Sequence, residues 1–319
     1  MKKRPLKPWH GLIFFIFIMA VFFVLCVPMQ WAWGLYGVAA TEIVILVIAI
    51  LFAKIMGFSL RTLFPVRLPE FLPLLGTFVM WGSGYIVTMV VMLIQYRLFP
   101  VQMTQVSSGL NQVIFSTPFL VSVFIVSILP AICEEAVHRG VILHSLYPIS
   151  KEWVVVLLMG LYFGVFHTDP LRFLPTAILG AIMSYIMLET ENMVYSSFFH
   201  FINNFLPLVL SLALSGMNSS EQFQQAQELL TEGSSMVIPV ASIGIYMILA
   251  AAAPFGFYLG NYLLHYKKGI RKSFIPEKNR WTVILSIAIP TIVIFVLGIF
   301  LFLGGILFDP VFHQYMRGF

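Results

Sequence analysis

Residues 118–146 read PFLVSVFIVSILPAICEEAVHRGVILHSL, an apolar run that is interrupted by one compact group of charged residues. A helix that crosses a bilayer needs about 20 mostly apolar residues, so this run is long enough to span a membrane. Charged side chains are costly inside such a helix and usually face a cavity or a partner. The stretch therefore predicts a membrane-spanning helix that carries a buried polar site.

The whole chain shares this apolar character. Of its 319 residues, 60% are hydrophobic and 10% are charged, against about 45–50% and about 25% in a typical globular protein. A soluble fold could not cover so much apolar surface with so few charges. The net charge of +5 does not indicate nucleic-acid binding, because the basic residues lie in short runs between apolar stretches. The composition predicts a polytopic membrane protein that is surrounded by membrane lipid.

Nine apolar stretches can cross the membrane as helices, so we expect an all-α transmembrane helix bundle. The predicted spans are residues 11–30, 33–53, 71–94, 118–146, 153–168, 171–188, 192–214, 236–264 and 281–307. We expect a single integral membrane domain over residues 1–319, with its core at about 116–207. The first three and last two spans would then be peripheral, and the polar stretch 215–235 would form an outer loop.

Lysine and arginine favour the cytoplasmic side of a membrane, so their distribution predicts the orientation of the chain. If the N-terminus is inside, the segments on the inner side carry most of the 18 Lys and Arg residues. The outer segments keep only Arg97, Arg172 and Arg317. We therefore expect a cytoplasmic N-terminus and, after nine crossings, a C-terminus on the outer side.

Helical spacing separates the roles of the charged residues in the fourth predicted span. Glu135 and Arg139 lie four residues apart with the acid first, which is the favourable order for an ion pair. Glu134 lies about 100° further round the helix, and its one evident cationic candidate is His138, also four residues on. A carboxyl group short of partners in a low-dielectric site suits a general base or acid. Glu42, in the second span, is more simply a contact with a neighbouring helix or with water.

Two later spans contain polar residues that could join this group. His167 lies near the end of the fifth predicted span, and Phe163 lies one turn earlier on the same face. His200 and Asn204 are four residues apart in the seventh. At about 1.5 Å per residue from the inner edge, Glu134, His167 and His200 all fall near the middle of the bilayer. A lone buried histidine is often only a packing residue, but a common depth favours a common cavity.

Together these residues resemble the three motifs of the CAAX-protease and bacteriocin-processing family. This family comprises the glutamate intramembrane endopeptidases that are also called Abi proteins or type II CAAX prenyl endopeptidases. The resemblance covers about residues 116–207 and rests on Glu134-Glu135-x-x-x-Arg139, Phe163-x-x-x-His167 and His200-x-x-x-Asn204. It implies an all-helical fold in a bacterial cell membrane, with a membrane-embedded site that opens to the cytoplasm.

The resemblance also implies an activity, namely peptide-bond hydrolysis without an obligatory metal or other cofactor. Glu134 would be the base and His167 its partner, while His200 and Asn204 would form the oxyanion site. Glu135, Arg139 and Phe163 would support them. The substrate would be a peptide or protein, such as a lipidated C-terminus or a leader peptide. Family members differ widely in substrate and some act without proteolysis, so the fold transfers better than the activity.

Three alternatives stay open from the residues alone. A zinc peptidase is the nearest rival, because Glu134, His138, His167 and His200 include zinc-ligand types, although no His-Glu-x-x-His occurs. A non-enzymatic regulator or immunity scaffold would keep the buried polar group only for its shape. A proton-coupled transporter would use it as a relay, but the chain has no inverted repeat or paired broken helices.

Overall fold

The computed structural model describes residues 6–105, 117–217, 237–266 and 273–317. Within these ranges the regular elements are helices, and no strand occurs among them. Eight helices are long and apolar enough to cross a membrane, and a further apolar helix, α10 (Glu152–Phe166), has 15 residues. The expected all-α fold is confirmed, whereas the number of spans and the orientation of the termini stay predictions.

The chain divides into two compact units, of which the first comprises Met1–Thr77 and Leu110–Leu206. Its first two long helical segments come from the N-terminal region: α1 (Pro8–Val21), η1 (Phe22–Cys26) and α2 (Val27–Trp33) follow one another, and α3 (Leu35–Ile55) comes next. Gly34, with φ +55°, makes the reversal between them, because that backbone conformation carries no steric penalty for glycine. The short helix α4 (Leu60–Leu63) and an extended segment lead on to α5 (Phe71–Leu98).

The fourth predicted span forms one long helical segment whose backbone changes type along its length. It consists of α7 (Phe119–Val123), the π-helical η2 (Phe124–Ile128), α8 (Leu129–Glu135), the π-helical η3 (Ala136–Ile142) and α9 (Leu143–Leu146). The first unit continues with α10, α11 (Pro170–Thr190) and the start of α12 (Met193–Met217). Its main core cluster is apolar and includes Ile18, Ile45, Val137, Ile142 and Met159.

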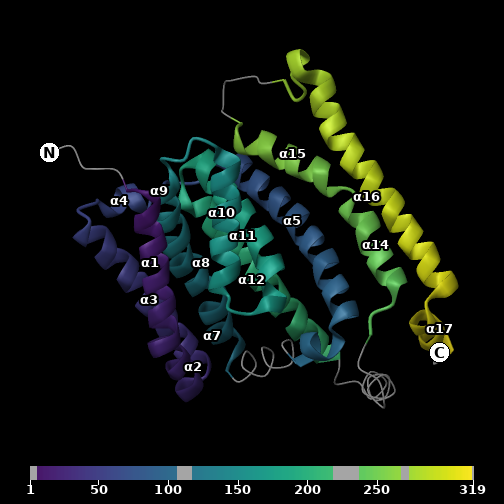
Figure 1. Cartoon of the computed structure of the whole chain (residues 1–319), viewed down its shortest axis with the longest axis horizontal. Coiled ribbons are helices and arrows are strands. Elements are labelled where there is room, and N and C mark those ends of the chain that lie inside the picture. The colour runs from purple at the N-terminus through teal and green to yellow at the C-terminus, as the bar shows by residue number, and fades with distance from the viewer. Residues whose placement is uncertain (1–5, 106–116, 218–236, 267–272, 318–319) are drawn as a thin grey trace. The chain divides into compact units, whose positions relative to one another are not determined.

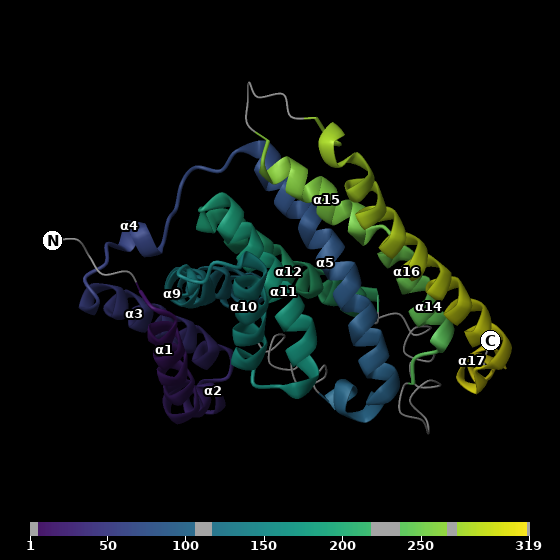
Figure 2. The same cartoon turned by 45° about the horizontal axis from the view of Figure 1, so that its top comes forward.

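Helices α10 and α11 lie side by side in the first unit (Figures 1 and 2). Small residues permit this contact: a Cβ added to Gly160 would lie 2.7 Å from the carbonyl oxygen of Ala177, and one at Gly180 would lie 2.5 Å from Cβ of Phe163. Close backbone approach at small residues is common where helices pack within membranes. The α10–α11 hairpin carries one motif of the predicted site, Phe163 and His167.

The second unit comprises Phe78–Gly109 and Pro207–Phe319. Its helices beyond α5 and α12 are α14 (Val240–Ala250), α15 (Ala253–Leu264), the 3₁₀ turn η4 (Glu277–Asn279), α16 (Arg280–Phe308) and α17 (Pro310–Arg317). Helix α14 lies along α16 (Figure 1), with Gly244 and Gly298 at the contact. The predicted span 236–264 is two helices, because a turn at 251–252 comes before Pro254, which lacks an N–H for helix bonding.

Candidate active site

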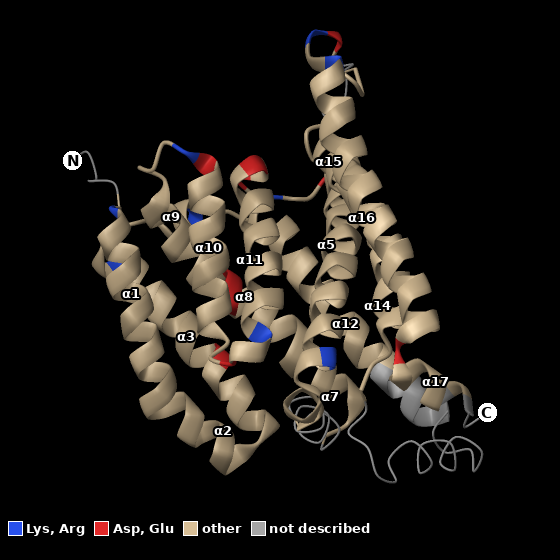
Figure 3. Ribbon diagram, turned by 45° about the vertical axis from the view of Figure 1, so that its right-hand side comes forward, with Lys and Arg blue, Asp and Glu red and all other residues tan. Residues whose placement is uncertain are grey.

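The two adjacent glutamates of the fourth predicted span lie where α8 passes into the π-helical η3. Figure 3 shows acidic residues in red at α8, whose last two residues are Glu134 and Glu135. Each residue from Cys133 to Leu143 is buried. A π-helical turn inserts one residue into an α-helix and is frequent at functional sites. Just after η3, Nδ1 of His144 lies 3.1 Å from the backbone carbonyl oxygen of Arg139, which is five residues earlier in the chain.

Glu135 and Arg139 form the predicted ion pair. Nη1 of Arg139 donates to Oε1 of Glu135 at 2.8 Å, and both side chains are fully buried. Nη2 of Arg139 donates to the carbonyl oxygen of Gly180 in α11 at 2.8 Å, and the guanidinium carbon lies 4.8 Å from the ring centre of Phe163 in α10. The pair is therefore confirmed, and its arginine joins η3 to both helices of the α10–α11 hairpin.

His200 reaches the same carboxylate from α12. Its Nδ1 lies 3.1 Å from Oε1 of Glu135, and because that oxygen accepts from Arg139 as well, we assign the proton to Nδ1. Its Nε2 lies 4.0 Å from Oε2 of Glu134. His200 is buried between the two glutamates: it is within hydrogen-bond distance of Glu135, but not of Glu134.

His167 follows the last residue of α10. Its Nδ1 lies 2.8 Å from the carbonyl oxygen of Phe163, so Nδ1 carries the proton and Nε2 is left as an acceptor. The next residue, Thr168, has φ +55°, an unusual conformation for a β-branched side chain. Asp169 then begins α11, since its Oδ1 accepts from the backbone N–H of Leu171 at 2.9 Å. This tight turn fixes His167 at the end of the α10–α11 hairpin.

Phe163 is the centre around which the imidazole rings gather. Its ring centre lies 4.8 Å from that of His167, 5.0 Å from that of His138 and 5.7 Å from that of His200. These three rings come from the residue that follows α10, from η3 and from α12, and the guanidinium of Arg139 lies over the same aromatic ring. The structure thus brings together side chains from three of the predicted motifs.

Glu134 differs from Glu135 in its bonding. Its side chain is buried, and Oε2 accepts no hydrogen bond from the residues that the structure describes. His138, the one cationic candidate on the same helix, does not bind this carboxylate, because its Nδ1 pairs with the backbone carbonyl oxygen of Glu134 at 2.9 Å. The side chains that interact electrostatically with its carboxylate include His200, Arg172 and Arg139, of which the first two belong to other helices.

The comparisons with known proteins agree with this geometry. Residues 116–206 match the family model described as type II CAAX prenyl endopeptidase Rce1-like. This stretch is an Rce1-like type II CAAX prenyl endopeptidase domain. No curated protein and no solved structure matched the chain. The family is one of proteases, so the match supports hydrolase activity. The described residues also include eight helices long and apolar enough to cross a membrane, so the chain is an integral multi-pass membrane protein.

Asn204 lies within the Rce1-like domain, one helical turn after His200. Its Nδ2 donates to the carbonyl oxygen of Val126 in η2 at 3.1 Å, and its Oδ1 accepts from Asn203 at 3.4 Å. In the π-helical turn η2 this carbonyl is available to a partner from another helix. Asn204 therefore fastens α12 to η2, and the second hydrogen of its amide nitrogen can serve another acceptor.

Two charged residues near Glu134 were not singled out as site residues from the sequence. Arg172, in the first turn of α11, interacts electrostatically with both Glu134 and His167. Glu42, in α3, is buried and interacts electrostatically with Glu134, although it lies outside the matched Rce1-like range. The position of Arg172 directly after the turn that follows His167 was the available signal. For Glu42 the signal was an acid within an apolar span.

Metal binding was the main rival interpretation of these side chains. Over the described ranges, no group of three or more His, Cys, Asp or Glu side chains is placed to hold a metal ion. His138, the additional zinc candidate, uses Nδ1 for a backbone carbonyl and packs its ring against Phe163 and Phe166. Its surroundings in the Rce1-like domain are those of a packed core histidine.

Proposed function

We propose that the protein is an intramembrane endopeptidase in which Glu134 activates a water molecule to hydrolyse a peptide bond. The observation that carries this proposal is the contrast between two adjacent carboxylates. Oε1 of Glu135 is bonded to both Arg139 and His200, and only its Oε2 is without a hydrogen bond. The carboxylate of Glu134 makes no hydrogen bond through Oε2 with the described residues and has no direct cationic partner like that of Glu135. A general base needs free accepting capacity within a site that excludes bulk water, and Glu134 has both properties.

The reaction proceeds in two steps. Glu134 removes a proton from water while the water oxygen attacks the carbonyl carbon of the scissile bond, which forms a tetrahedral intermediate with its negative charge on the former carbonyl oxygen. The proton then passes from Glu134 to the amide nitrogen, the C–N bond breaks, and an amine and a carboxylic acid are released. This sequence regenerates the carboxylate of Glu134 and needs no metal or other cofactor.

His167 has a role that follows from its tautomer. Because Nδ1–H is directed at the carbonyl oxygen of Phe163, its Nε2 is the atom that can accept a hydrogen bond. In the proposed mechanism Nε2 holds the second hydrogen of the attacking water and directs the lone pair of the water oxygen toward the substrate. His167 thus orients the nucleophile and Glu134 takes its proton.

His200 and Asn204 are proposed to stabilise the oxyanion. Since Nδ1–H of His200 is held by Glu135, the donor toward the oxyanion would be Nε2–H of the doubly protonated ring. Glu135 already pairs with Arg139, so the carboxylate of Glu134, 4.0 Å from Nε2, would balance the charge of the ring. Asn204 would donate the hydrogen that is not directed at Val126. Donors of this type lower the barrier by about 3–4 kcal/mol each.

The proposed substrates are membrane-associated peptides or proteins, including lipidated C-termini and leader peptides. We propose the cell membrane of a bacterium as the location. The family match over residues 116–206 supports proteolysis as the activity class, while the substrate and the mechanism depend on the residues discussed above.

A proteomic comparison tests this function. Membrane and secreted peptides are compared between cells with the wild type, Glu134→Gln and Glu152→Gln, a matched change of an exposed acid at the start of α10. We expect at least one substrate to stay uncleaved only in Glu134→Gln cells. Identical peptide patterns in all three would contradict the peptidase and favour a non-proteolytic regulator or immunity scaffold.

A further inference from the structure

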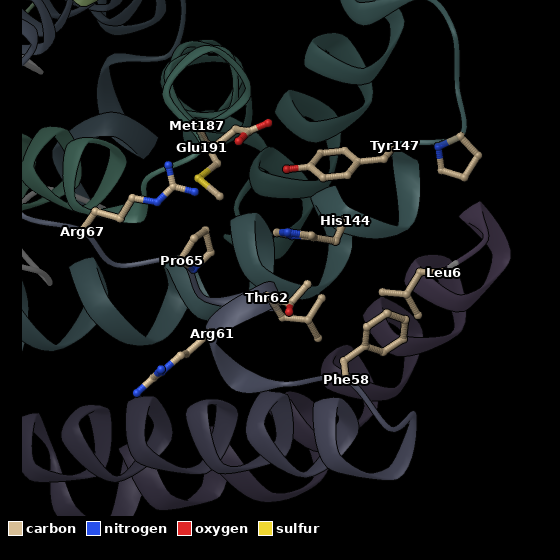
Figure 4. Close-up of a pocket in the computed structure, with 12 residues that line it drawn as sticks. Leu6, Phe58, Arg61, Thr62, Pro65, Arg67, His144, Tyr147, Met187 and Glu191 are labelled. Atoms are coloured by element: carbon tan, nitrogen blue, oxygen red, sulfur yellow. The ribbon is translucent and has the colours of Figure 1, made fainter. Parts of the chain in front are cut away.

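A cavity of about 660 Å³ lies in the first unit, outside the proposed catalytic site. Its polar lining consists of Arg61, Thr62, Arg67, His144, Tyr147 and Glu191 (Figure 4). The cavity is not lined by any of the four proposed catalytic residues, Glu134, His167, His200 and Asn204. The cavity is therefore a separate place in the fold that the proposed peptidase chemistry does not use.

The charged groups of the lining leave one unmatched positive charge. The lining residues include two arginines, Arg61 and Arg67, and one acid, Glu191. In Figure 4 the guanidinium of Arg67 points toward Met187 and Glu191, that of Arg61 extends away from the other labelled side chains, and Tyr147 directs its hydroxyl toward the side of Glu191. A ligand with a single negative charge would balance the lining. Arginine suits a phosphate in particular, because its planar group can donate two parallel hydrogen bonds.

Arg67 is held in place by its backbone rather than left on a free loop. Its N–H donates to Oδ1 of Asn192 at 3.0 Å, and Nδ2 of Asn192 donates to its carbonyl oxygen at 3.1 Å. The backbone N–H of Met193 donates to the carbonyl oxygen of Pro65 at 2.8 Å, and Asn192 is buried. These three bonds attach the extended segment before α5 to the start of α12. The cation is thereby presented at a fixed point of the cavity wall.

The rest of the lining is apolar. Leu6 and Phe58 form one end of the cavity, opposite Arg67, and Met187 lies beneath Glu191 in Figure 4. A wall with two cations at one end and aliphatic and aromatic groups at the other fits an amphiphile. Arg61 and Arg67 also belong to the segment that the positive-inside rule assigns to the cytoplasmic surface, where phospholipid phosphates lie.

We propose that this cavity binds the phosphodiester headgroup of an anionic phospholipid. The phosphate binds the guanidinium of Arg67, and the exposed side chain of Arg61 turns inward to add a second contact. Hydroxyl groups of the headgroup reach Glu191 and Tyr147, and the first acyl carbons run along Leu6 and Phe58. One phosphodiester charge completes neutrality with two arginines and one glutamate. Basic pockets between membrane helices on the cytoplasmic side are a known setting for lipid headgroups. The lipid site is independent of the proposed peptidase chemistry.

The test uses the purified full chain in detergent, with melting temperature as the measurement. Short-chain phosphatidylglycerol, short-chain phosphatidylcholine and inorganic phosphate are titrated in separate arms. We expect phosphatidylglycerol to raise the melting temperature of the wild type at concentrations where the other two have little effect. Arg67→Gln and Arg61→Gln should each weaken the response to phosphatidylglycerol about tenfold or more. Lys151→Gln, a change of an exposed lysine outside the cavity, should leave it unchanged.

Three results would overturn the proposal. Equal stabilisation by inorganic phosphate would identify a simple anion site, and equal stabilisation by phosphatidylcholine would show that the net charge of the headgroup is not recognised. A wild-type response to phosphatidylglycerol in both arginine variants would place lipid binding elsewhere on the protein. Both substitutions change exposed side chains, so the two variants serve as checks on each other's folding.

Discussion

Two ion pairs, one in each unit, show different patterns of bonding: Glu135–Arg139 is fully buried, whereas in Arg97–Asp309 the acid is buried and the arginine is partly exposed. In the second unit Oδ1 of Asp309 accepts from Arg97 at 3.1 Å and from the backbone N–H of Val311 at 3.1 Å, while Oδ2 accepts from the N–H of Val240 at 2.8 Å. Asp309 thus pairs with one cation, Arg97, and both of its carboxylate oxygens accept hydrogen bonds. In the first unit the Glu135–Arg139 pair has a second acid, Glu134, directly beside it, with an oxygen that accepts no hydrogen bond from the described residues.

The difference separates a structural ion pair from a reactive group. Asp309 joins the ends of α14, α16 and α17 to Arg97 of α5, and its bonding is complete. A buried polar atom without a hydrogen bond costs about 1–3 kcal/mol. Oε2 of Glu135 is also unbonded, but Oε1 of that carboxylate is bonded to Arg139 and His200, whereas Glu134 has no such anchoring contact, so its burial has a reason other than stability. In the proposed mechanism that reason is the binding and deprotonation of water.

The largest expected effect within this comparison is on rate. His167→Ala removes the acceptor that orients the water but touches neither ion pair, so we expect the cleavage rate to fall about 10²–10⁴-fold with little change in melting temperature. The cleavage rate is measured with purified protein and a defined substrate, and the melting temperature is measured by thermal unfolding. A wild-type rate in His167→Ala would remove the histidine from the mechanism.

The next effect is on stability. Glu135→Ala would leave the buried guanidinium of Arg139 without its carboxylate, at a cost of about 3–5 kcal/mol in the free energy of unfolding. Glu134→Gln keeps the shape of its side chain and breaks no hydrogen bond of the Glu134 carboxylate with a described residue. We expect lower abundance and a lower melting temperature for the first variant only. If both variants melt alike, the division of roles between the adjacent glutamates is wrong.

The smallest effect concerns the complete ion pair of the second unit. Asp309→Asn keeps the size of the side chain but weakens its bonds to Arg97 and to Val240, so we expect a loss of about 1–3 kcal/mol in stability. The cleavage rate per folded molecule should not change. A rate loss as large as that of His167→Ala would mean that the second unit takes part in catalysis.

Local spacing was enough to predict part of this site. Glu135 and Arg139 lie on one helix four residues apart, so their pairing needed no knowledge of other helices. The long apolar runs likewise predicted the helical fold, because length and composition decide it. The separations within the later two motifs placed His167 and His200 on candidate helices, and the structure gathers both around Phe163.

Features that depend on packing between helices could not be predicted. Nothing in the residues of η2 and η3 distinguishes a π-helical turn from an α-helical one, yet η3 contains both His138 and Arg139. The sequence did not indicate a role for Gly180. In the structure its carbonyl oxygen accepts a hydrogen bond from Arg139, and it leaves no room for a Cβ beside Phe163. Arg172 was assigned to an outer segment, and only the fold of the α10–α11 hairpin brings it near Glu134.

The most direct test of the account is peptide cleavage by purified wild type and Glu134→Gln after exhaustive chelation. The account predicts that the chelated wild type keeps its rate, that added zinc gives no increase, and that Glu134→Gln folds normally but cleaves at least about 10²-fold more slowly. Loss of wild-type activity on chelation with recovery on zinc addition would contradict the metal-free mechanism, and full activity of Glu134→Gln would contradict the assignment of Glu134 as the base.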